Sequence, residues 1–528
     1  MRDNQYPGRS VVMSTHGMIA TSQPMATQTG LAVLQAGGNA MDAAIAAAAV
    51  LCVTEPHATG IGGDCFLLYH EAKTGKLHGL NGSGRAPVRA TPEEFERRGL
   101  MQVPEFGMLS VIVPGAVDAW QTALERFGTR GLEELLQPAI AFAEDGYAVT
   151  PVVAKSWHNN AAVLAPHAES RRDYLVDGRA PVAGTVYRQP RLAQSLRKIA
   201  HGGRDAFYRG PIAEAIVRHS QAHDGLLGLE DFAEYRSEWV EPISADYRGV
   251  RVYEIPPNGQ GITALMALNI LEQADLRGLT HLSVDHLHWV IEAFKLAWAE
   301  RDEYVADPAF NQLPVAEMLS KEFAARQYAR IDPQRAARYP VAHAARAHRD
   351  TVYLSVVDRE RNAVSFINSL YYPFGSGVVA GDTGIMLQNR GAGFVLEPEH
   401  FNCIAPRKRP LHTIIPAMAY RGDDILSFGV MGGEYQPMGH VYVLTNWLDF
   451  GLDLQEAIDA PRFMPGGGIV ALERPVPQDI LKALQQRGHV MGRTELALGG
   501  AQAIYVDAKN GVLSAGSDPR KDGCALGY

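Results

Sequence analysis

One stretch of the chain decides the fold: Arg349-Asp350-Thr351-Val352-Tyr353-Leu354-Ser355-Val356-Val357-Asp358. The residues after Thr351 are mostly β-branched or aromatic, which predicts a β-strand. The preceding run, 339–350, holds a proline, many small residues and no apolar period, which predicts an exposed loop. A hydroxyl side chain therefore stands where a loop enters a strand. Most threonines in such a place only begin the strand, so the meaning of Thr351 depends on the rest of the chain.

The regions before and after Thr351 differ in their patterns. Before it, the sequence predicts helices at 24–37, 40–53, 115–120, 132–142, 262–271 and 283–306, with strands only at 65–70, 76–80 and 251–255. After it, strands are predicted at 363–369, 384–387, 414–420, 425–429, 503–506 and 512–515, with helices at 438–450 and 454–460. A helix-rich first two-thirds therefore meets a sheet-rich last third at the loop before Thr351.

Composition excludes several classes of function. The 528 residues are 46% apolar and 20% charged with a net charge of −9, as in an acidic globular protein. This charge argues against nucleic-acid or anionic-membrane partners. The four cysteines form no CxxC pair, and the longest apolar run, Ala43 to Val53, is too short to span a bilayer. Because the start of the chain has no apolar signal region, we expect a cytoplasmic protein.

Two sequence features resemble cofactor sites, a glycine-rich run and a pair of histidines, but neither has the arrangement that such a site requires. The glycines of Gly60-Ile61-Gly62-Gly63 precede a predicted strand, whereas a dinucleotide loop follows one. His286 and His288 are two residues apart on a predicted helix and do not share a face, so they are not expected to bind a metal together. We therefore expect neither a metal nor an organic cofactor.

Motifs along nearly the whole chain resemble the γ-glutamyltranspeptidase family. The early ones are Gly38-Asn39-Ala40-Met41-Asp42-Ala43-Ala44 and Gly60-Ile61-Gly62-Gly63. The later ones follow Thr351 in the family's order: Asn362-Ala363-Val364, 368–377, Gly384-Ile385, Leu387-Gln388-Asn389, Arg409-Pro410-Leu411, Gly432-Gly433 and Gly516-Ser517-Asp518-Pro519-Arg520.

The resemblance implies an N-terminal-nucleophile hydrolase, an α+β fold built as a four-layer αββα sandwich. In that family a precursor cuts itself before a threonine, and the two fragments stay together. The matching position is Thr351, so the resemblance implies cleavage of the Asp350–Thr351 bond. The fragments would be a large segment, 1–350, and a small segment, 351–528, that form one unit.

The expected catalytic groups follow from this match. A threonine hydroxyl is a weak nucleophile that needs a base, and the α-amine of an N-terminal threonine, with a pKa of roughly 8, can supply it. Gly432 and Gly433 align with the family's oxyanion glycines, whose backbone N–H groups can approach a tetrahedral intermediate closely. Ser369 stands where the family has a threonine that hydrogen-bonds the nucleophile.

The substrate-binding positions depart from the family's pattern. The family holds a substrate α-carboxylate with an arginine at the position of Ser83, although Arg85 lies two residues further on. Its α-amine ligands correspond to Tyr371, Arg390 and Gly393, so an acid is lost and a cation is gained. The family's serine pair is replaced by His412-Thr413. With Asn389 beside Arg390, these residues predict a pocket for an anion, because arginine is the preferred partner of a carboxylate.

Such a pocket is similar to that of the family's oxamate amidohydrolase branch, whose small substrate carries a carboxylate and no α-amine. That branch releases oxalate and ammonia during purine breakdown. Two other functions remain open: a γ-glutamyltransferase or glutathione hydrolase, and a silent scaffold that never matures. Arg390 could also do no more than pair with a neighbouring residue. The expected partners are the anionic amide and the two fragments themselves, and a homo-oligomer is left open.

Overall fold

We describe the protein from a computed structural model that covers residue 5 and residues 8–338 and 351–528. Its centre is a pair of seven-stranded sheets. The first sheet has the order β19 (Cys524–Gly527), β2 (Met18–Thr21), β10 (Val352–Val357), β11 (Ala363–Ser369), β3 (Asp64–Glu71), β4 (Lys76–Gly82) and β7 (Glu238–Val240). The second has the order β1 (Val12–Ser14), β18 (Val512–Ser517), β17 (Gly500–Asp507), β13 (Asp424–Met431), β12 (Ala417–Arg421), β9 (Val250–Glu254) and β8 (Ile243–Tyr247).

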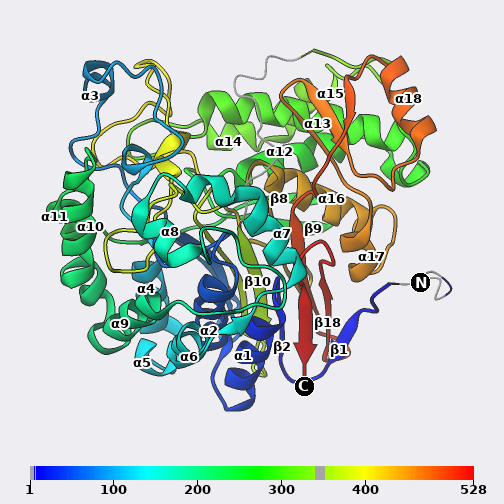
Figure 1. Ribbon diagram of the computed structural model, residues 1–528. Helices are drawn as coiled ribbons and strands as arrows, with labels where there is room; N and C mark the ends of the chain where they lie inside the picture. Colours follow the sequence, from blue (N-terminus) through cyan, green and yellow to red (C-terminus); the bar gives the residue numbers. More distant parts are fainter. Residues whose placement is uncertain (1–4, 6–7, 339–350) are drawn as a thin grey trace.

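The two sheets stack face to face and helices cover both outer faces (Figure 1). Between the sheets lies an apolar layer that includes Phe66 and Tyr353 from the first sheet and Met418 and Ile504 from the second. The expected four-layer αββα sandwich is therefore confirmed. Inner-facing side chains of such stacked sheets fill the space between them, while alternate residues face the helices.

The helices fall into two layers with smaller elements around them. Over the first sheet lie α1 (Pro24–Gln35), α2 (Ala40–Thr54), α4 (Ala116–Phe127), α5 (Leu132–Leu135), α6 (Gln137–Asp145), α9 (Pro190–Tyr208) and α10 (Pro211–Ala222). Over the second lie α12 (Gly261–Leu271), α13 (Val284–Tyr304), α15 (Lys321–Tyr328), α16 (Gln436–Leu448), α17 (Leu454–Asp459) and α18 (Gln478–Gln486). The remaining elements are α3 (Pro92–Arg97), α7 (Pro151–Asn160), α8 (Ala168–Tyr174), α11 (Leu229–Glu234), α14 (Val315–Met318), the pair β5 (Tyr147–Ala148) and β6 (Val186–Tyr187), and the small sheet of β14 (Phe463–Gly466), β15 (Ile469–Leu472) and β16 (Met491–Arg493).

Both halves of the chain contribute to both sheets. In the first sheet, β10 pairs with β2 on one side and with β11 on the other, and β11 pairs with β3 (Figure 1). In the second, β12 pairs with β9. Each sheet thus combines strands from before and after Thr351, and the helix-rich and sheet-rich regions of the sequence are not separate bodies.

Most elements predicted from the sequence are present with shifts of a few residues at their ends. Helix α2, apolar nearly all round, is buried along its whole length, as its pattern predicts. The strand predicted at 384–387 is wrong, because Met386 and Leu387 form only isolated bridges, to Val379 and Gly62. The loop predicted at 339–350 lies outside the described residues. In the part of the chain that the structure describes, no helix is long and apolar enough to cross a membrane.

Candidate active site

Four residues at the ends of neighbouring strands form one row across the first sheet. The register pairs Val352 with Asn368, Asn368 with Cys65, and Cys65 with Gly82. The next row at this edge therefore holds Thr351, Ser369, Asp64 and Ser83, of which Ser369 and Asp64 are paired directly. Residues 351 and 353 face the same side of the strand, and Tyr353 lies between the sheets, so Thr351 also faces the second sheet.

Thr351 is buried, with 1% of its surface exposed, and contacts the predicted hydroxyl partner. Its Oγ1 lies 3.0 Å from Oγ of Ser369. The Ser369 hydroxyl also accepts a hydrogen bond of 2.9 Å from the backbone N–H of Tyr371. Tyr371 has φ of 84°, a left-handed conformation that is costly for an aromatic residue. The turn after β11 is thus held in a strained shape around the Ser369 hydroxyl.

The end of β13 in the second sheet comes toward Thr351. Ser355 Oγ lies 2.9 Å from Ser427 Oγ, and the backbone of Gly429 leaves room for the ring of Tyr353. Ser355 thus lies opposite Ser427, and Tyr353 lies opposite Gly429, so the two strands run in opposite directions. Two residues further along, Thr351 comes to lie opposite Met431. Gly432 and Gly433 follow directly, with φ of 125° and 59°. Both values favour glycine, and a Cβ on Gly432 would lie 2.9 Å from Cα of Gly499.

Arg390 is a fully buried cation next to these groups. It begins a short 3₁₀ turn, Arg390–Gly393. Its Nη1 donates to Oγ1 of Thr413 at 2.7 Å, and its Nη2 lies 3.5 Å from Oγ of Ser369. The guanidinium carbon sits 4.0 Å from the centre of the Tyr371 ring, a cation–π distance. Arg390, Tyr371, Thr413 and Ser369 therefore form one contact group around the Thr351 hydroxyl.

His412 and Asp64 form a buried pair behind Arg390. His412 Nε2 lies 2.9 Å from Oδ2 of Asp64, and the N–H of Ile414 donates to His412 Nδ1 at 3.3 Å, so Nε2 carries the ring proton. Burial raises the pKa of the Asp64 carboxyl to about 7, although Arg390 acts to lower it. Burial, with Arg390 and Arg409 nearby, holds the pKa of His412 well below its usual value. His412 is therefore a neutral hydrogen-bond donor and not a second cation.

One buried amide ties the second sheet to this group. Gln260 Nε2 donates to the carbonyl oxygens of Thr413 at 2.8 Å and of Gly433 at 3.0 Å. Its side-chain oxygen accepts from Nη1 of Arg301 at 2.7 Å, and Arg301 also contacts Glu434. Contacts thus run without interruption from Gly433 to the Thr351 hydroxyl, by way of Gln260, Thr413, Arg390 and Ser369.

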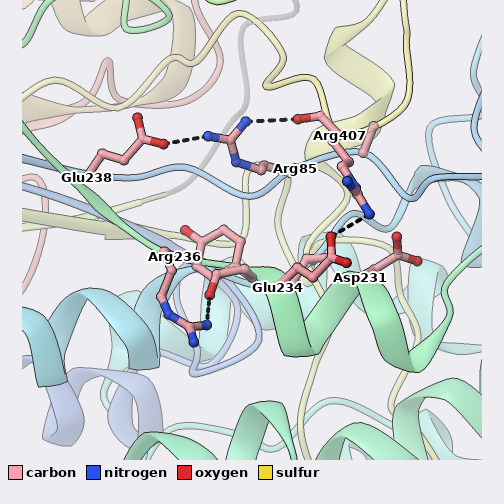
Figure 2. Close-up of a pocket in the computed structure, with 9 residues that line it drawn as sticks. Arg85, Asp231, Glu234, Arg236, Glu238 and Arg407 are labelled. Carbon is pink, nitrogen blue, oxygen red and sulfur yellow. Dashed lines mark hydrogen bonds and ion pairs between the residues drawn. The ribbon is translucent and has the colours of Figure 1, made fainter.

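Two residues predicted to bind substrate have other partners. The side chain of Asn389 donates to the Glu105 carbonyl at 2.7 Å and accepts from the N–H of Tyr372 at 3.1 Å, so it shapes the loop. Arg85 lies in a surface pocket, where it donates to Glu238 at 2.6 Å and to the Arg407 carbonyl at 3.0 Å (Figure 2). The substrate role of Arg85 stays a prediction. Asp350 lies outside the described residues.

A cavity of about 220 Å³ opens against Gly432. Its lining includes Pro373 from the turn that carries Tyr371, Tyr435 from the turn after Gly433, and Lys155 from α7. Arg520 and Lys521 also line it, and its described lining includes no carboxylate. Arg520 pairs with Glu473 at 2.6 Å, so the cavity is a space beside the end of β13 to which Lys155 and Lys521 bring positive charge.

A second cluster of titratable side chains lies away from this site. His288, Glu292 and His489 come close enough to hold a metal ion. However, the ammonium of Lys295 already lies 2.7 Å from Glu292 Oε1 and 3.4 Å from His489 Nδ1. Lys295 thus supplies the positive charge that the carboxylate needs. As predicted, His286 stands apart from His288: it accepts from the N–H of Leu282 and packs on Phe450.

The sequence predictions missed two residues of the site, Asp64 and Gln260. Asp64 follows the quoted glycine motif directly, and Gln260 lies between Gly259 and Gly261 ahead of α12. Each is a polar residue next to glycines at the junction of a loop and a regular element, which is a signal that could have found them. Gln388 and His412, the side-chain partners of Asp64, and the Thr413 carbonyl that Gln260 binds are more than 100 residues away in the chain, so pattern alone could not supply these contacts.

Comparisons with known proteins agree with this geometry. The model of the family described as gamma-glutamyltranspeptidase matches residues 26–528. The glutathione hydrolase-like YwrD proenzyme of Bacillus subtilis is 39% identical over 98% of this chain and 99% of its own length. The oxamate amidohydrolase proenzyme of Klebsiella pneumoniae is 35% identical over 98% of this chain and 99% of its own length.

A solved structure extends the likeness to the fold. The cephalosporin acylase from Bacillus halodurans matches with a TM-score of 0.92 and 44% identity, over 99% of this chain and 98% of its own. A family match over nearly the whole length, relatives of the same length and a shared four-layer fold agree with one another. The chain therefore belongs to the γ-glutamyltranspeptidase family and is an N-terminal-nucleophile hydrolase that acts on amide bonds.

Proposed function

We propose that this protein is a self-processing threonine amidohydrolase for a small amide that carries a carboxylate, with oxamate as the substrate. The precursor cuts itself between Asp350 and Thr351, and its two segments, 1–350 and 351–528, stay together as large and small subunits. The products of the enzyme are oxalate and ammonia, as in purine breakdown. The four cysteines, all free thiols, support a reducing, cytoplasmic setting.

The proposed reaction uses the groups around Thr351 in sequence. The new α-amine of Thr351 takes the proton of its own hydroxyl, and Oγ1 attacks the amide carbon. Backbone N–H groups of Gly432 and Gly433 stabilise the oxyanion. The C–N bond breaks, the proton passes to the leaving nitrogen, and ammonia departs. Water then hydrolyses the acyl ester on Thr351, which restores the free hydroxyl and releases oxalate.

The observation that carries the proposal is the buried guanidinium of Arg390 beside the nucleophile. Its Nη2 lies 3.5 Å from Oγ of Ser369, and that oxygen lies 3.0 Å from Oγ1 of Thr351. In oxamate the carboxylate is bonded directly to the carbon under attack, so a cation this close to the hydroxyl is suitably placed for it. An α-ammonium in the same place would be repelled by Arg390, which counts against an amino-acid substrate.

Two measurements test the proposal. A denaturing gel of fresh and aged protein should show conversion to two fragments, and sequencing of the smaller one should begin at Thr351. The processed protein should release ammonia from oxamate faster than it turns over a γ-glutamyl anilide. A chain that stays single would refute processing, and faster anilide turnover would refute the anion pocket.

The second candidate function is a glutathione hydrolase. Its support is the similarity to the glutathione hydrolase-like YwrD proenzyme, which at 39% identity exceeds the 35% of the oxamate amidohydrolase proenzyme. The same substrate comparison decides between them. The third candidate, a silent scaffold, predicts a chain that is neither cut nor active, although its Thr351 and Ser369 hydroxyls lie within hydrogen-bond distance.

A further inference from the structure

The turn that carries the two candidate oxyanion glycines is tied to the rest of the site by a side chain. Within the turn, the Gly432 carbonyl accepts from the N–H of Tyr435 at 3.1 Å, and the Gly433 carbonyl accepts from the N–H of Gln436. These bonds shape the turn but do not place it against other segments. The Gly433 carbonyl also accepts from Nε2 of Gln260 at 3.0 Å, and Gln260 comes from the loop before α12.

The amide of Gln260 has one orientation. It is fully buried, and its Oε1 accepts from Nη1 of Arg301 at 2.7 Å. Because the oxygen faces that cation, both N–H donors of the amide point the other way, where they meet the carbonyl oxygens of Gly433 and Thr413. The backbone N–H of Gln260 also donates to the His412 carbonyl at 3.0 Å. Every polar atom of this side chain therefore has a partner.

The second carbonyl that Gln260 binds belongs to the candidate anion pocket. Thr413 accepts from Nε2 of Gln260 at its backbone oxygen, at 2.8 Å, and from Nη1 of Arg390 at its hydroxyl, at 2.7 Å. One amide nitrogen thus holds the turn of Gly433 and the residue that contacts the Arg390 guanidinium. The separation between the oxyanion glycines and Arg390 therefore depends on Gln260.

That separation decides which amides fit. In the proposed reaction the amide oxygen lies at Gly432 and Gly433, and the substrate carboxylate lies at Arg390. In oxamate the amide carbon and the carboxylate carbon are bonded directly, whereas malonamate, the next longer homologue, has a CH₂ group between them. A fixed separation suits one of these lengths, because a misplacement of about 1 Å can cost roughly 100-fold in rate.

We propose that Gln260 is a positioning residue that makes the site selective for the chain length of an anionic amide. It does so by holding the Gly433 turn at a fixed separation from Arg390. This rests on the proposed function, because it requires a carboxylate at Arg390 and an oxyanion at the two glycines. Without the amide donors, the buried Thr413 carbonyl loses its bond to Gln260, and the Gly433 turn is no longer tied to Thr413.

The test compares oxamate with malonamate in the processed wild-type enzyme and in two variants. We expect the wild type to favour oxamate in kcat/KM by roughly 100-fold. Gln260→Met keeps the length of the side chain but has no donor, so kcat on oxamate should fall and the oxamate-to-malonamate ratio should shrink by roughly tenfold or more. Gln260→Glu keeps the acceptor for Arg301 but turns an oxygen toward the two carbonyls, so it should show the same loss of selectivity.

Gln327 on α15 provides the matched control. It is also buried, accepts from Nη1 of Arg330 at 2.7 Å and donates to Oε1 of Glu300 at 3.0 Å. Its partners lie in the helix layer over the second sheet, away from Gly433 and Thr413. Gln327→Met should therefore lower the melting temperature and leave the oxamate-to-malonamate ratio unchanged. Fragment formation on a gel verifies that each variant folds.

The outcomes separate the inference from the proposed function. A wild-type enzyme that hydrolyses oxamate and malonamate equally well overturns the inference and leaves the function standing, even if every variant fails to fold. A Gln260 variant that is slower on both substrates by the same factor also overturns it. If the wild type prefers malonamate and Gln260→Met loses that preference, oxamate is refuted as the substrate while the inference stands. A wild type that releases ammonia from neither amide refutes both.

Discussion

Replacement of Arg390 by methionine removes the positive charge and keeps much of the side chain's length. The native guanidinium is fully buried and within 3.5 Å of Ser369 Oγ, so a substrate carboxylate beside it would be cut off from water. Loss of one partner from such a buried charged pair costs about 2–5 kcal/mol. We therefore expect kcat/KM for oxamate to fall roughly 30- to 4,000-fold, since about 1.4 kcal/mol corresponds to a factor of ten.

The assay compares oxamate with oxamide, the neutral diamide of nearly the same size. Arg390→Met should lose most of its activity on oxamate and much less on oxamide, because only oxamate has a charge to satisfy. Arg390→Lys should fall between, because lysine keeps the charge but lacks the planar fork. Arg462→Met is the matched control: Arg462 is equally buried but pairs with Asp518 at 2.6 Å, so stability should fall while the oxamate-to-oxamide ratio stays unchanged. Equal losses on both substrates in Arg390→Met would refute the reasoning.

Three further substitutions test the rest of the site. Thr351→Ala should remain a single chain without activity, whereas Thr351→Ser should still be cut; a processed, active Thr351→Ala protein would mean that another residue is the nucleophile. Ser369→Ala removes the acceptor for the Tyr371 N–H and the partner of Thr351, so the activation free energy should rise by about 1–3 kcal/mol and kcat should fall roughly 5- to 150-fold. Ser369→Thr should stay close to wild type. An unchanged kcat in Ser369→Ala would exclude the contact from the mechanism. Gly432→Ala meets Cα of Gly499 at 2.9 Å and should lose more than 100-fold in kcat, whereas Gly422→Ala, also at positive φ but in open space, should lose only stability; similar kinetics in the two variants would speak against an oxyanion role.

The elements of the fold were largely predictable because their signals are local. The β-branched run after Thr351 and the apolar α2 each reveal their structure within one window of sequence. The segment 384–387 was mispredicted as a strand: its backbone is held by single bridges and by the Thr383 hydroxyl, which strand propensity does not detect. Short strands such as β2 and β19 were missed, since each is only four residues long and depends on its neighbours in the sheet.

The candidate site was predictable where a single residue carries the chemistry. It was less predictable where a role depends on contacts between residues from different segments. Thr351, Ser369 and Arg390 could be selected by position, and the structure brings them together. The importance of Asp64 depends on four donors from distant segments, which no spacing rule contains. Arg85 was selected because it lies near Ser83 in the sequence; in the structure its guanidinium points to Glu238, and its substrate role stays a prediction.

The sharing of both sheets between the two halves of the chain bears on what a cut before Thr351 would leave behind. Neither segment could dissociate without breaking strand pairs in both sheets, so the cleaved molecule would hold together as well as the intact one. Once denatured, however, the pieces would have to meet again by diffusion, each with bare strand edges that invite aggregation. The lifetime of the folded, cleaved protein would then depend on how slowly the sheets unfold, and its apparent melting temperature would shift with the heating rate.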